Sequence, residues 1–234
     1  MSEYRHEYKY VCTLKQLAYV NNAVKGIMEL DSNVSEEGCY IVRSLYFDDY
    51  WNSCYYDNLY GHEPREKFRI RIYNGSSSNI NLELKKKQNG KIKKESCRLT
   101  YDICRRIIDG KELDFNAMDA ALYRKFCLQY FTKILRPKVI VEYDRVPYVY
   151  KDGNVRVTLD KNIRSSNQYS CFLENNIFSR PIMENNRHLL EIKYDEYLPD
   201  FIYQLAENEK IKQTTFSKYF LCRKYSMGGN NNEL

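Results

Sequence analysis

Charged residues recur at alternate positions in several segments of this chain of 234 residues. The clearest cases are Glu7 and Lys9, Arg69 and Arg71, Glu83 with Lys85 and Lys87, and Glu191 and Lys193. Alternate residues of a β-strand point to the same face of the sheet, so each set predicts a charged strand face. The residues between them, such as Phe68 and Ile70, are apolar or aromatic. The pattern predicts strands with one ionic face and one apolar face.

These ionic faces are suited to an anionic ligand. A sheet with one face in solvent shows the same alternation, so the pattern on a single strand says little. Two arginines on one strand face, such as Arg69 and Arg71, repel each other unless an anion or a carboxylate lies between them. The paired arginines therefore favour binding of an anion over simple exposure to solvent.

The elements that must position these residues are mostly strands. Period-two alternation predicts strands at residues 4–13, 40–47, 66–74, 80–87, 92–99, 138–148, 155–161 and 189–194, with 216–224 as a further candidate. Residues 75–79 and 88–90 contain Gly, Ser and Asn, which predicts hairpin loops and a local antiparallel meander. Helices are predicted at 14–28, 101–108, 117–131 and 199–209.

About eight strands with few helices form a sheet that curls and closes on itself. The charged faces would then line the interior, and the apolar faces would lie outward beneath the helices. Buried charges without partners are very costly, so such an interior requires a long, highly charged ligand such as polyphosphate or a nucleoside triphosphate. We therefore predict an α+β fold built on a closed, mainly antiparallel β tunnel with a polar interior and flanking helices.

Composition limits the class of protein. The chain has 37 basic and 31 acidic residues and a net charge of +6, which favours an anionic partner. Nucleic acid is an unfavourable candidate, because the basic residues follow the strand period and do not cluster on a helix. The eight cysteines form no Cys-x-x-Cys pair, which argues against a structural zinc site and a redox motif.

Domain organisation and location follow from the absence of certain segments. No linker divides the sequence, which predicts one domain at residues 1–226 and a disordered tail at 227–234. The sequence has no apolar run of about 18 residues and no apolar core near its charged amino terminus. We therefore expect a cytoplasmic protein without a transmembrane segment of its own; a membrane-bound partner stays open.

In order along the chain, the charged segments resemble the triphosphate tunnel metalloenzymes. Within this superfamily they are most similar to the catalytic domain of the vacuolar transporter chaperone (VTC) polyphosphate polymerases. The matching segments are residues 5–10 (RHEYKY), 44–48 (SLYFD), 67–73 (KFRIRIY), 82–85 (LELK), 92–94 (IKK), 141–145 (VEYDR), 155–160 (VRVTLD), 190–193 (LEIK) and 216–218 (FSK). Thiamine-triphosphatase-like and adenylyl-cyclase-like relatives begin with Glu-x-Glu-x-Lys. Arg5 replaces their first glutamate here, which favours the polymerase branch.

The resemblance implies roles for individual residues. The side chains that would line the tunnel and act catalytically on the triphosphate and the product chain are Lys9, Arg69, Arg71, Lys85, Lys94, Arg145, Arg156 and Lys218. Arg5, Tyr143, Lys193 and Ser217 would complete the substrate contacts, and Glu191 would hold a divalent metal, Mn²⁺ or Mg²⁺. Thr215 stands where the family pattern has a further lysine, so that phosphate contact is not carried over.

The implied activity is transfer of the γ-phosphate of ATP to a growing polyphosphate chain, with positioning by the protein and no side chain as nucleophile. ATP and inorganic polyphosphate are then the expected partners. A triphosphatase of the same fold, which hydrolyses a nucleoside triphosphate or inorganic triphosphate, uses the same residues with water as the acceptor. A non-catalytic module that binds polyphosphate or inositol phosphates is the third possibility.

Overall fold

The computed structural model describes residues 4–32, 34 and 38–228. Its long strands are β1 (His6–Thr13), β3 (Tyr40–Asp48), β4 (Arg65–Tyr73), β5 (Ser76–Gln88), β6 (Lys91–Leu99), β7 (Arg136–Tyr150), β8 (Val155–Ser166) and β10 (Arg187–Tyr194). The short strands β2 (Glu29–Leu30) and β9 (Arg180–Pro181) pair with β7 and β8. The helices are α1 (Leu14–Lys25), α2 (Ser53–Leu59), α3 (Tyr101–Ile108), α4 (Ala121–Thr132), α5 (Asp200–Asn208) and α6 (Lys218–Ser226).

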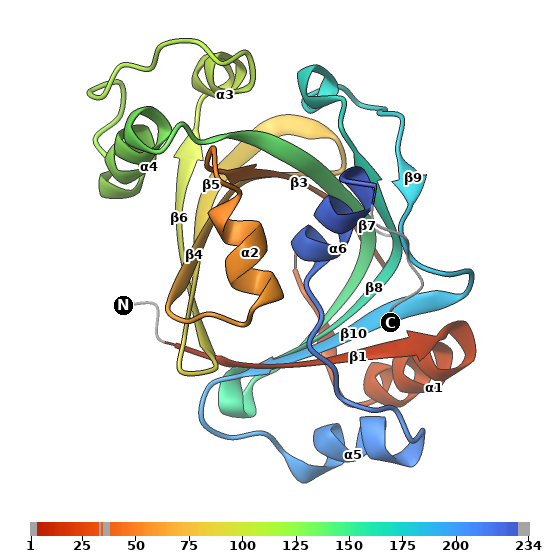
Figure 1. Ribbon diagram of the computed structural model, residues 1–234. Coiled ribbons are helices and arrows are strands. Elements are labelled where there is room, and N and C mark those ends of the chain that lie inside the picture. The colour runs from red at the N-terminus through yellow and green to blue at the C-terminus, as the bar shows by residue number, and fades with distance from the viewer. Residues whose placement is uncertain (1–3, 33, 35–37, 229–234) are drawn as a thin grey trace.

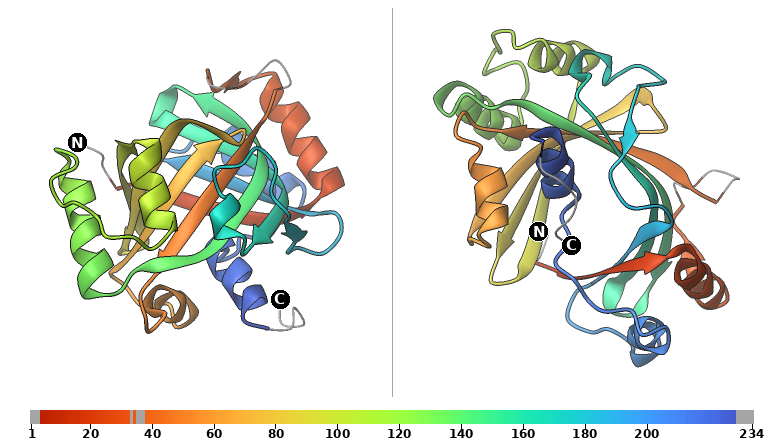
Figure 2. Two further views of the ribbon diagram at one scale, coloured as in Figure 1. Left: turned by 90° about the horizontal axis from the view of Figure 1, so that it is seen from above. Right: turned by 45° about the vertical axis from the view of Figure 1, so that its right-hand side comes forward.

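The long strands form one antiparallel sheet that curls into a barrel (Figures 1 and 2). Their order is β1-β10-β8-β7-β3-β4-β5-β6. The two ends of this path meet where Arg5 and Ile92 exchange backbone hydrogen bonds of 2.8 and 2.9 Å. The predicted α+β fold with a curled antiparallel sheet and flanking helices is confirmed.

The apolar faces of the strands point outward and form two cores beneath the helices. Leu45, Ile70 and Leu82 are fully buried in the core that also includes residues of α3 and α4. A second core joins Val157 and Ile192 to residues of α1 and α5. Helices thus shield the outer face of the sheet from water and leave the inner face for charged side chains.

A third apolar cluster lies on the inner strand faces and involves α6. Val42 and Val141 pack there with Phe216, Tyr219 and Cys222. In Figure 1, α6 lies within the outline of the curled sheet. The inner face is therefore apolar beside α6 and charged beyond it.

The strand predicted at 216–224 is wrong, because Lys218–Ser226 form α6. Ser217 accepts a hydrogen bond from the backbone N–H of Phe220 and caps this helix. The buried residues Lys218, Leu221 and Cys222 are three and four positions apart, which is a helical spacing. The segment is too short for its polar pattern to distinguish a strand from a helix, and packing inside the barrel favours the helix.

The other differences are smaller. Helix α2 was not predicted, α1 ends before the expected residue 28, and the helix expected from residue 117 begins at Ala121. The first hairpin turns at Asn74 and Gly75, with φ of 51° and 65°, so β5 begins within the predicted loop. The second hairpin turns at Asn89 and Gly90, as predicted.

The proposed domain boundaries stay a prediction. Of the predicted tail, Met227 and Gly228 follow α6, and residues 229–234 lie outside the described residues. Within the part of the chain that the structure describes, no helix has the length and apolar character needed to cross a membrane.

Candidate active site

The inner strand faces surround a cavity of about 320 Å³, here called the lumen. Every residue to which the sequence assigned a role lines it: Arg5, Lys9, Arg69, Arg71, Lys85, Lys94, Tyr143, Arg145, Arg156, Glu191, Lys193, Ser217 and Lys218. They come from β1, β4, β5, β6, β7, β8, β10 and α6, or lie directly before β1 and α6. The curled sheet therefore brings together residues that are up to about two hundred positions apart in sequence, as non-local strand pairing allows.

Glu83 resolves the predicted repulsion between two arginines. Its carboxylate accepts hydrogen bonds from Arg69 Nε at 2.6 Å and Lys94 Nζ at 3.0 Å, and Arg71 Nη1 lies at 3.8 Å. Burial acts to raise the pKa of Glu83, but Arg69, Arg71 and Lys94 together outweigh burial and hold the pKa well below its usual range. Glu83 is therefore a permanent counterion at one side of the lumen.

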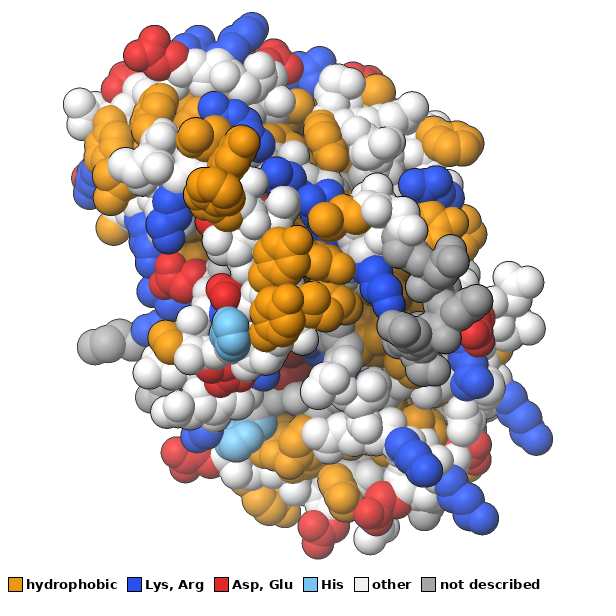
Figure 3. All heavy atoms as spheres, viewed as in Figure 1, with side chains coloured by type: hydrophobic (Ala, Val, Ile, Leu, Met, Phe, Trp, Pro, Cys, Tyr) orange, Lys and Arg blue, Asp and Glu red, His pale blue; other side chains and the backbone are white. Residues whose placement is uncertain are grey.

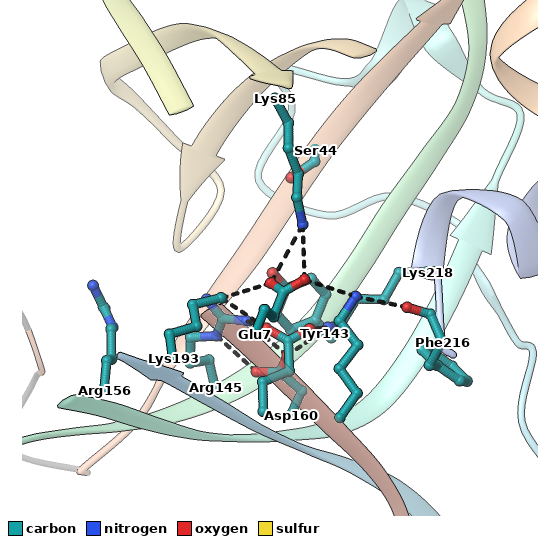
Figure 4. A network of polar contacts seen from close by, with 12 residues as sticks. Glu7, Ser44, Lys85, Tyr143, Arg145, Arg156, Asp160, Lys193, Phe216 and Lys218 are labelled. Carbon is teal, nitrogen blue, oxygen red and sulfur yellow. Dashed lines mark hydrogen bonds and ion pairs between the residues drawn. The ribbon is translucent and has the colours of Figure 1, made fainter. Parts of the chain in front are cut away.

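Glu191 and Asp160 form a second anionic centre, and Figure 4 shows Asp160 with the cations Arg145, Lys193 and Lys218 of this centre. Glu191 accepts from Lys218 Nζ at 2.6 Å and from Lys193 Nζ at 2.8 Å. Asp160 accepts two hydrogen bonds from Arg145, both at 2.7 Å, and lies 2.7 Å from Lys218 Nζ. Burial acts to raise the pKa of both carboxyl groups. Arg145 and Lys218 outweigh burial and lower the pKa of Asp160. Lys193 and Lys218 likewise lower the pKa of Glu191.

Glu7 forms the third centre. It lies 3.1 Å from Lys9 Nζ, 3.1 Å from Lys85 Nζ and 3.5 Å from Lys193 Nζ. Burial acts to raise the pKa of Glu7, but Lys85, Lys9 and Lys193 outweigh burial and lower it. Because Lys193 also contacts Glu191, it connects this centre to the second one.

Two arginines are paired with acids outside these centres. Arg5 Nε lies 2.7 Å from Asp195, and Arg156 Nη2 lies 2.8 Å from Asp31 and 3.1 Å from Tyr40 Oη. Next to this region a second hollow shares Tyr40, Tyr73, Lys94 and Arg156 with the lumen and is otherwise lined mainly by amides and hydroxyls: Asn74, Ser76, Ser78, Asn79, Asn81 and Ser96. The lumen is thus rich in cations, and the adjoining hollow is polar but closer to neutral.

The acidic partners and Lys67 had no predicted role in the site. Asp160 resembles a strand-end acid in the sequence, yet its side chain is fully buried against Arg145 and Lys218. Glu7 and Glu83 stand two residues from Lys9 and Lys85, and this shared strand face was the signal available for them. Thr215 is exposed, and the lumen is lined by its neighbours from Ser217 onward.

The metal assignment can be tested against the donors present. No group of three or more His, Cys, Asp and Glu side chains that could hold a metal occurs among the described residues. Mg²⁺ is commonly held by one or two carboxylates together with substrate phosphates and water. Glu191 is a buried, ionised oxygen donor inside the lumen, so the residues fit a divalent ion that arrives with a phosphate ligand.

The curled sheet and its charged lumen define a tunnel fold, and two solved structures share it. One is a putative adenylate cyclase from Bacillus halodurans, with a TM-score of 0.56, 12% identity and coverage of 92% of this chain and 95% of that chain. The other is a putative adenylyl cyclase from Hippeastrum, described as having a dominant triphosphatase activity, with a TM-score of 0.58, 12% identity and coverage of 97% and 98%. At such low identity these similarities show the fold alone. No curated protein matches the sequence significantly.

The sequence also matches the VTC domain over residues 4–227. The chain therefore belongs to the VTC domain family, and the resemblance identified from its charged segments is confirmed. Family and fold together support a polyphosphate-related tunnel enzyme of phosphoryl transfer.

Proposed function

We propose that this protein is a polyphosphate polymerase that transfers the γ-phosphate of ATP to a growing inorganic polyphosphate chain inside the lumen. The observation that carries the proposal is the charge of the lumen, which among the described residues is lined by eleven Lys and Arg residues and two carboxylates, Glu7 and Glu191. Four further acids lie against these cations, Asp31, Glu83, Asp160 and Asp195, so positive charge remains in excess. A buried surface of this charge requires anionic ligands. Membership of the VTC domain family supports polyphosphate as that ligand.

Phosphoryl transfer needs in-line positioning and neutralisation of negative charge more than covalent chemistry by the protein. An oxygen of the terminal phosphate of the chain attacks the γ-phosphorus, the bond from that phosphorus to the β,γ-bridging oxygen breaks, and ADP leaves. Arg69, Arg71 and Arg145 can bind phosphate oxygens with two N–H groups each. The lysines of the lumen act as point charges along the chain.

The buried carboxylates keep the cations in place before the substrate binds. Each arginine or lysine that binds a phosphate oxygen exchanges part of its contact with Glu7, Glu83, Asp160 or Glu191 for the new anion. Fixed charges of this kind need little reorganisation during the reaction, which is the main source of electrostatic catalysis. Release of Glu191 from Lys193 and Lys218 also exposes its oxygens.

Glu191 is the residue that would hold a divalent metal, Mn²⁺ or Mg²⁺. When bound, such an ion neutralises charge on the phosphates and orients them. Lys193 and Lys218 would then turn to the phosphate oxygens. We expect the protein to act in the cytoplasm, where ATP is available as the donor.

Incubation of the protein with ATP and Mn²⁺, followed by ³¹P NMR of the products, tests the proposal. Internal phosphate signals of a long chain, formed together with ADP, are expected. Orthophosphate and ADP in equal amounts, without chain signals, would assign the protein to hydrolysis.

A triphosphatase is the second candidate, because the structural relative from Hippeastrum is described as having that activity. The same lumen would bind the triphosphate, and water would replace the terminal phosphate as the acceptor. Arg5 in place of the first glutamate of the Glu-x-Glu-x-Lys strand favours the polymerase. Tight binding of tripolyphosphate without any turnover of ATP would instead indicate a binding module.

A further inference from the structure

A row of three lysines crosses the inner face of the sheet. Lys67 on β4 lies directly opposite Lys85 on β5, and Lys85 lies directly opposite Lys94 on β6. All three line the lumen. Like charges directly opposite each other on neighbouring strands are destabilising, so this row needs negative charge beside it.

Two of the three lysines have that charge in the protein itself. Lys85 is paired with Glu7 at 3.1 Å, and Lys94 is paired with Glu83 at 3.0 Å. Lys67 has no carboxylate within 4.0 Å among the residues that the structure describes. Its Nζ instead lies 4.2 Å from the centre of the Tyr219 ring, a contact that attracts the cation but leaves its charge uncompensated.

Lys67 is distinct in this respect from the other cations of the lumen. Within the described part of the chain, every other lysine and arginine that lines the lumen lies within 4.0 Å of a carboxylate. Asp48 lies in the same region, but it accepts hydrogen bonds from Tyr219 Oη at 2.5 Å and from the backbone N–H groups of Cys54 and Tyr55. The carboxylate of Asp48 is thus already hydrogen-bonded to α2 and α6.

We propose that Lys67, together with Lys85 and Lys9, forms an anion subsite beside α6 that binds one phosphoryl group of an inorganic phosphate chain. The ligand class rests on the proposed function, but the subsite serves a polymerase and a triphosphatase equally. Lys9 contributes from β1, where its Nζ donates to the carbonyl oxygen of Phe216 at 2.7 Å. Lys9 and Lys85 share one carboxylate, Glu7, and Lys67 has none among the described residues, so a phosphoryl group supplies the charge that is missing.

The protonation of Lys67 gives the subsite a measurable signature. The pKa of Lys67 is lowered to about 7, chiefly by burial; Arg65 and Lys9 add to this lowering, and Cys54 and Asp48 oppose it. The neighbours of the Lys67 ammonium group are Lys85, on the opposite strand position, and the ring of Tyr219. Among the described residues, no carboxylate forms an ion pair with this group. A bound phosphoryl group raises this pKa, and binding at pH 8 must therefore take up a proton.

Calorimetric titration with inorganic tripolyphosphate, without metal or nucleotide, tests the subsite. Titrations at pH 8 in buffers of different ionisation enthalpy give both the affinity and the number of protons taken up. For Lys67→Met we expect affinity about tenfold weaker, as for loss of one charged contact, and about one proton fewer taken up. Lys93→Met is the matched control, since Lys93 lies next to Lys94 on β6 but not in the lumen, and it should match the unmodified protein.

A second variant keeps the test independent of folding. Lys67→Arg retains a permanent charge, so its affinity should stay within a few-fold of the original while the proton uptake assigned to Lys67 is lost. Unchanged affinity and proton uptake in Lys67→Met would overturn the subsite. If ATP is not converted to polyphosphate but Lys67→Met still weakens tripolyphosphate binding, the polymerase proposal fails and the subsite stands. If the protein makes polyphosphate and Lys67→Met binds tripolyphosphate normally, the polymerase proposal stands and the subsite fails.

Discussion

At the scale of single residues, the lumen is a set of compensated ion pairs. Glu7, Glu83, Asp160 and Glu191 are all buried or nearly so, and each lies within 3.1 Å of at least two cations. Buried pairs seldom add net stability compared with apolar residues, but removal of one member is strongly destabilising. Such a set of buried pairs suits a surface that binds a charged ligand.

Replacement of Glu191 by Gln separates metal-dependent turnover from phosphate binding. The amide cannot supply the anionic oxygen that a divalent ion requires, so turnover of ATP with Mn²⁺ should be lost. Lys218 retains Asp160 as a partner, and Lys193 becomes available to phosphate, so metal-free binding of tripolyphosphate should persist. Undiminished synthesis by Glu191→Gln, measured as polyphosphate formed, would rule out the metal assignment.

The lowered pKa values of the buried carboxylates predict sensitivity to acid. A carboxylate whose pKa is lower in the folded state stabilises the fold above its unfolded pKa and loses that contribution as the pH falls. The ordinary pKa values of these groups are 3.8 for Asp160 and 4.5 for Glu7, Glu83 and Glu191. The free energy of unfolding in urea should therefore fall steadily as the pH is lowered through and below this range.

Asp160→Asn provides the control for that pH dependence. It leaves Arg145 without its bidentate partner, and we expect a loss of about 3 kcal/mol in unfolding free energy at pH 7. The variant should also show a shallower decline in acid than the unmodified protein. An equally steep decline would mean that other carboxylates cause the acid sensitivity.

Lys67 differs from these carboxylates because the fold disfavours its charged form. Its pKa is lowered to about 7 from the ordinary value of 10.5, so between these values the unfolded chain binds more protons and stability rises with pH. Lys67→Met removes an ammonium group that destabilises the unliganded fold. Its melting temperature at pH 7 should therefore be higher than that of the unmodified protein, and a lower melting temperature would show that Lys67 has a structural role.

At the scale of elements, α6 connects the apolar end of the barrel interior with the charged lumen. Its first residues, Lys218 and Tyr219, reach Glu191 and Asp48, and its later residues pack in the third apolar cluster. Helix α2 is held through the same Asp48, which accepts hydrogen bonds at that helix's amino-terminal end. In Figure 3 hydrophobic side chains gather over α2, where Tyr56, Leu59 and Tyr60 are exposed.

Tyr219→Phe tests this connection. The ring remains beside Lys67, but the 2.5 Å hydrogen bond to Asp48 is lost, and a hydrogen bond to a charged group contributes about 2 kcal/mol. We expect a loss of that order in unfolding free energy, with binding of tripolyphosphate nearly unchanged. Tyr197→Phe, at an exposed tyrosine, should change neither quantity. Equal stability of the two variants would show that the Asp48 contact does not hold α6.

The sequence predicted the strands better than the partners across them. Period-two charge located β1, β4, β5 and β10, because that signal is local to each strand. The role of Asp160 depends on the pairing of β8 with β7, which places Asp160 opposite Arg145. The unpaired charge of Lys67 depends on the register of β4, β5 and β6. Neither pairing can be read from one segment of the sequence. Helix α6 was misassigned because a segment of nine residues is too short for its period to decide between strand and helix.

At the scale of the whole molecule, the fold has an inverted distribution of polarity. Two apolar cores lie outside the sheet beneath helices, and the interior holds charges that the protein only partly neutralises. Since the chain also has a net charge of +6, association with phosphate chains should weaken as salt concentration rises, most strongly for ion pairs near the openings of the lumen. This architecture suits the linear phosphate chain of the proposed function.

The most direct test of a phosphate-binding lumen is a crystal structure of the protein with Mn²⁺ and a slowly hydrolysed ATP analogue. We expect electron density for the triphosphate in the lumen between Arg69, Arg71 and Arg145, with the metal ion beside Glu191 and the side chains of Lys193 and Lys218 turned toward phosphate oxygens. A triphosphate bound only on the outer surface, with the ion pairs of the lumen unchanged, would contradict the proposed role of the lumen.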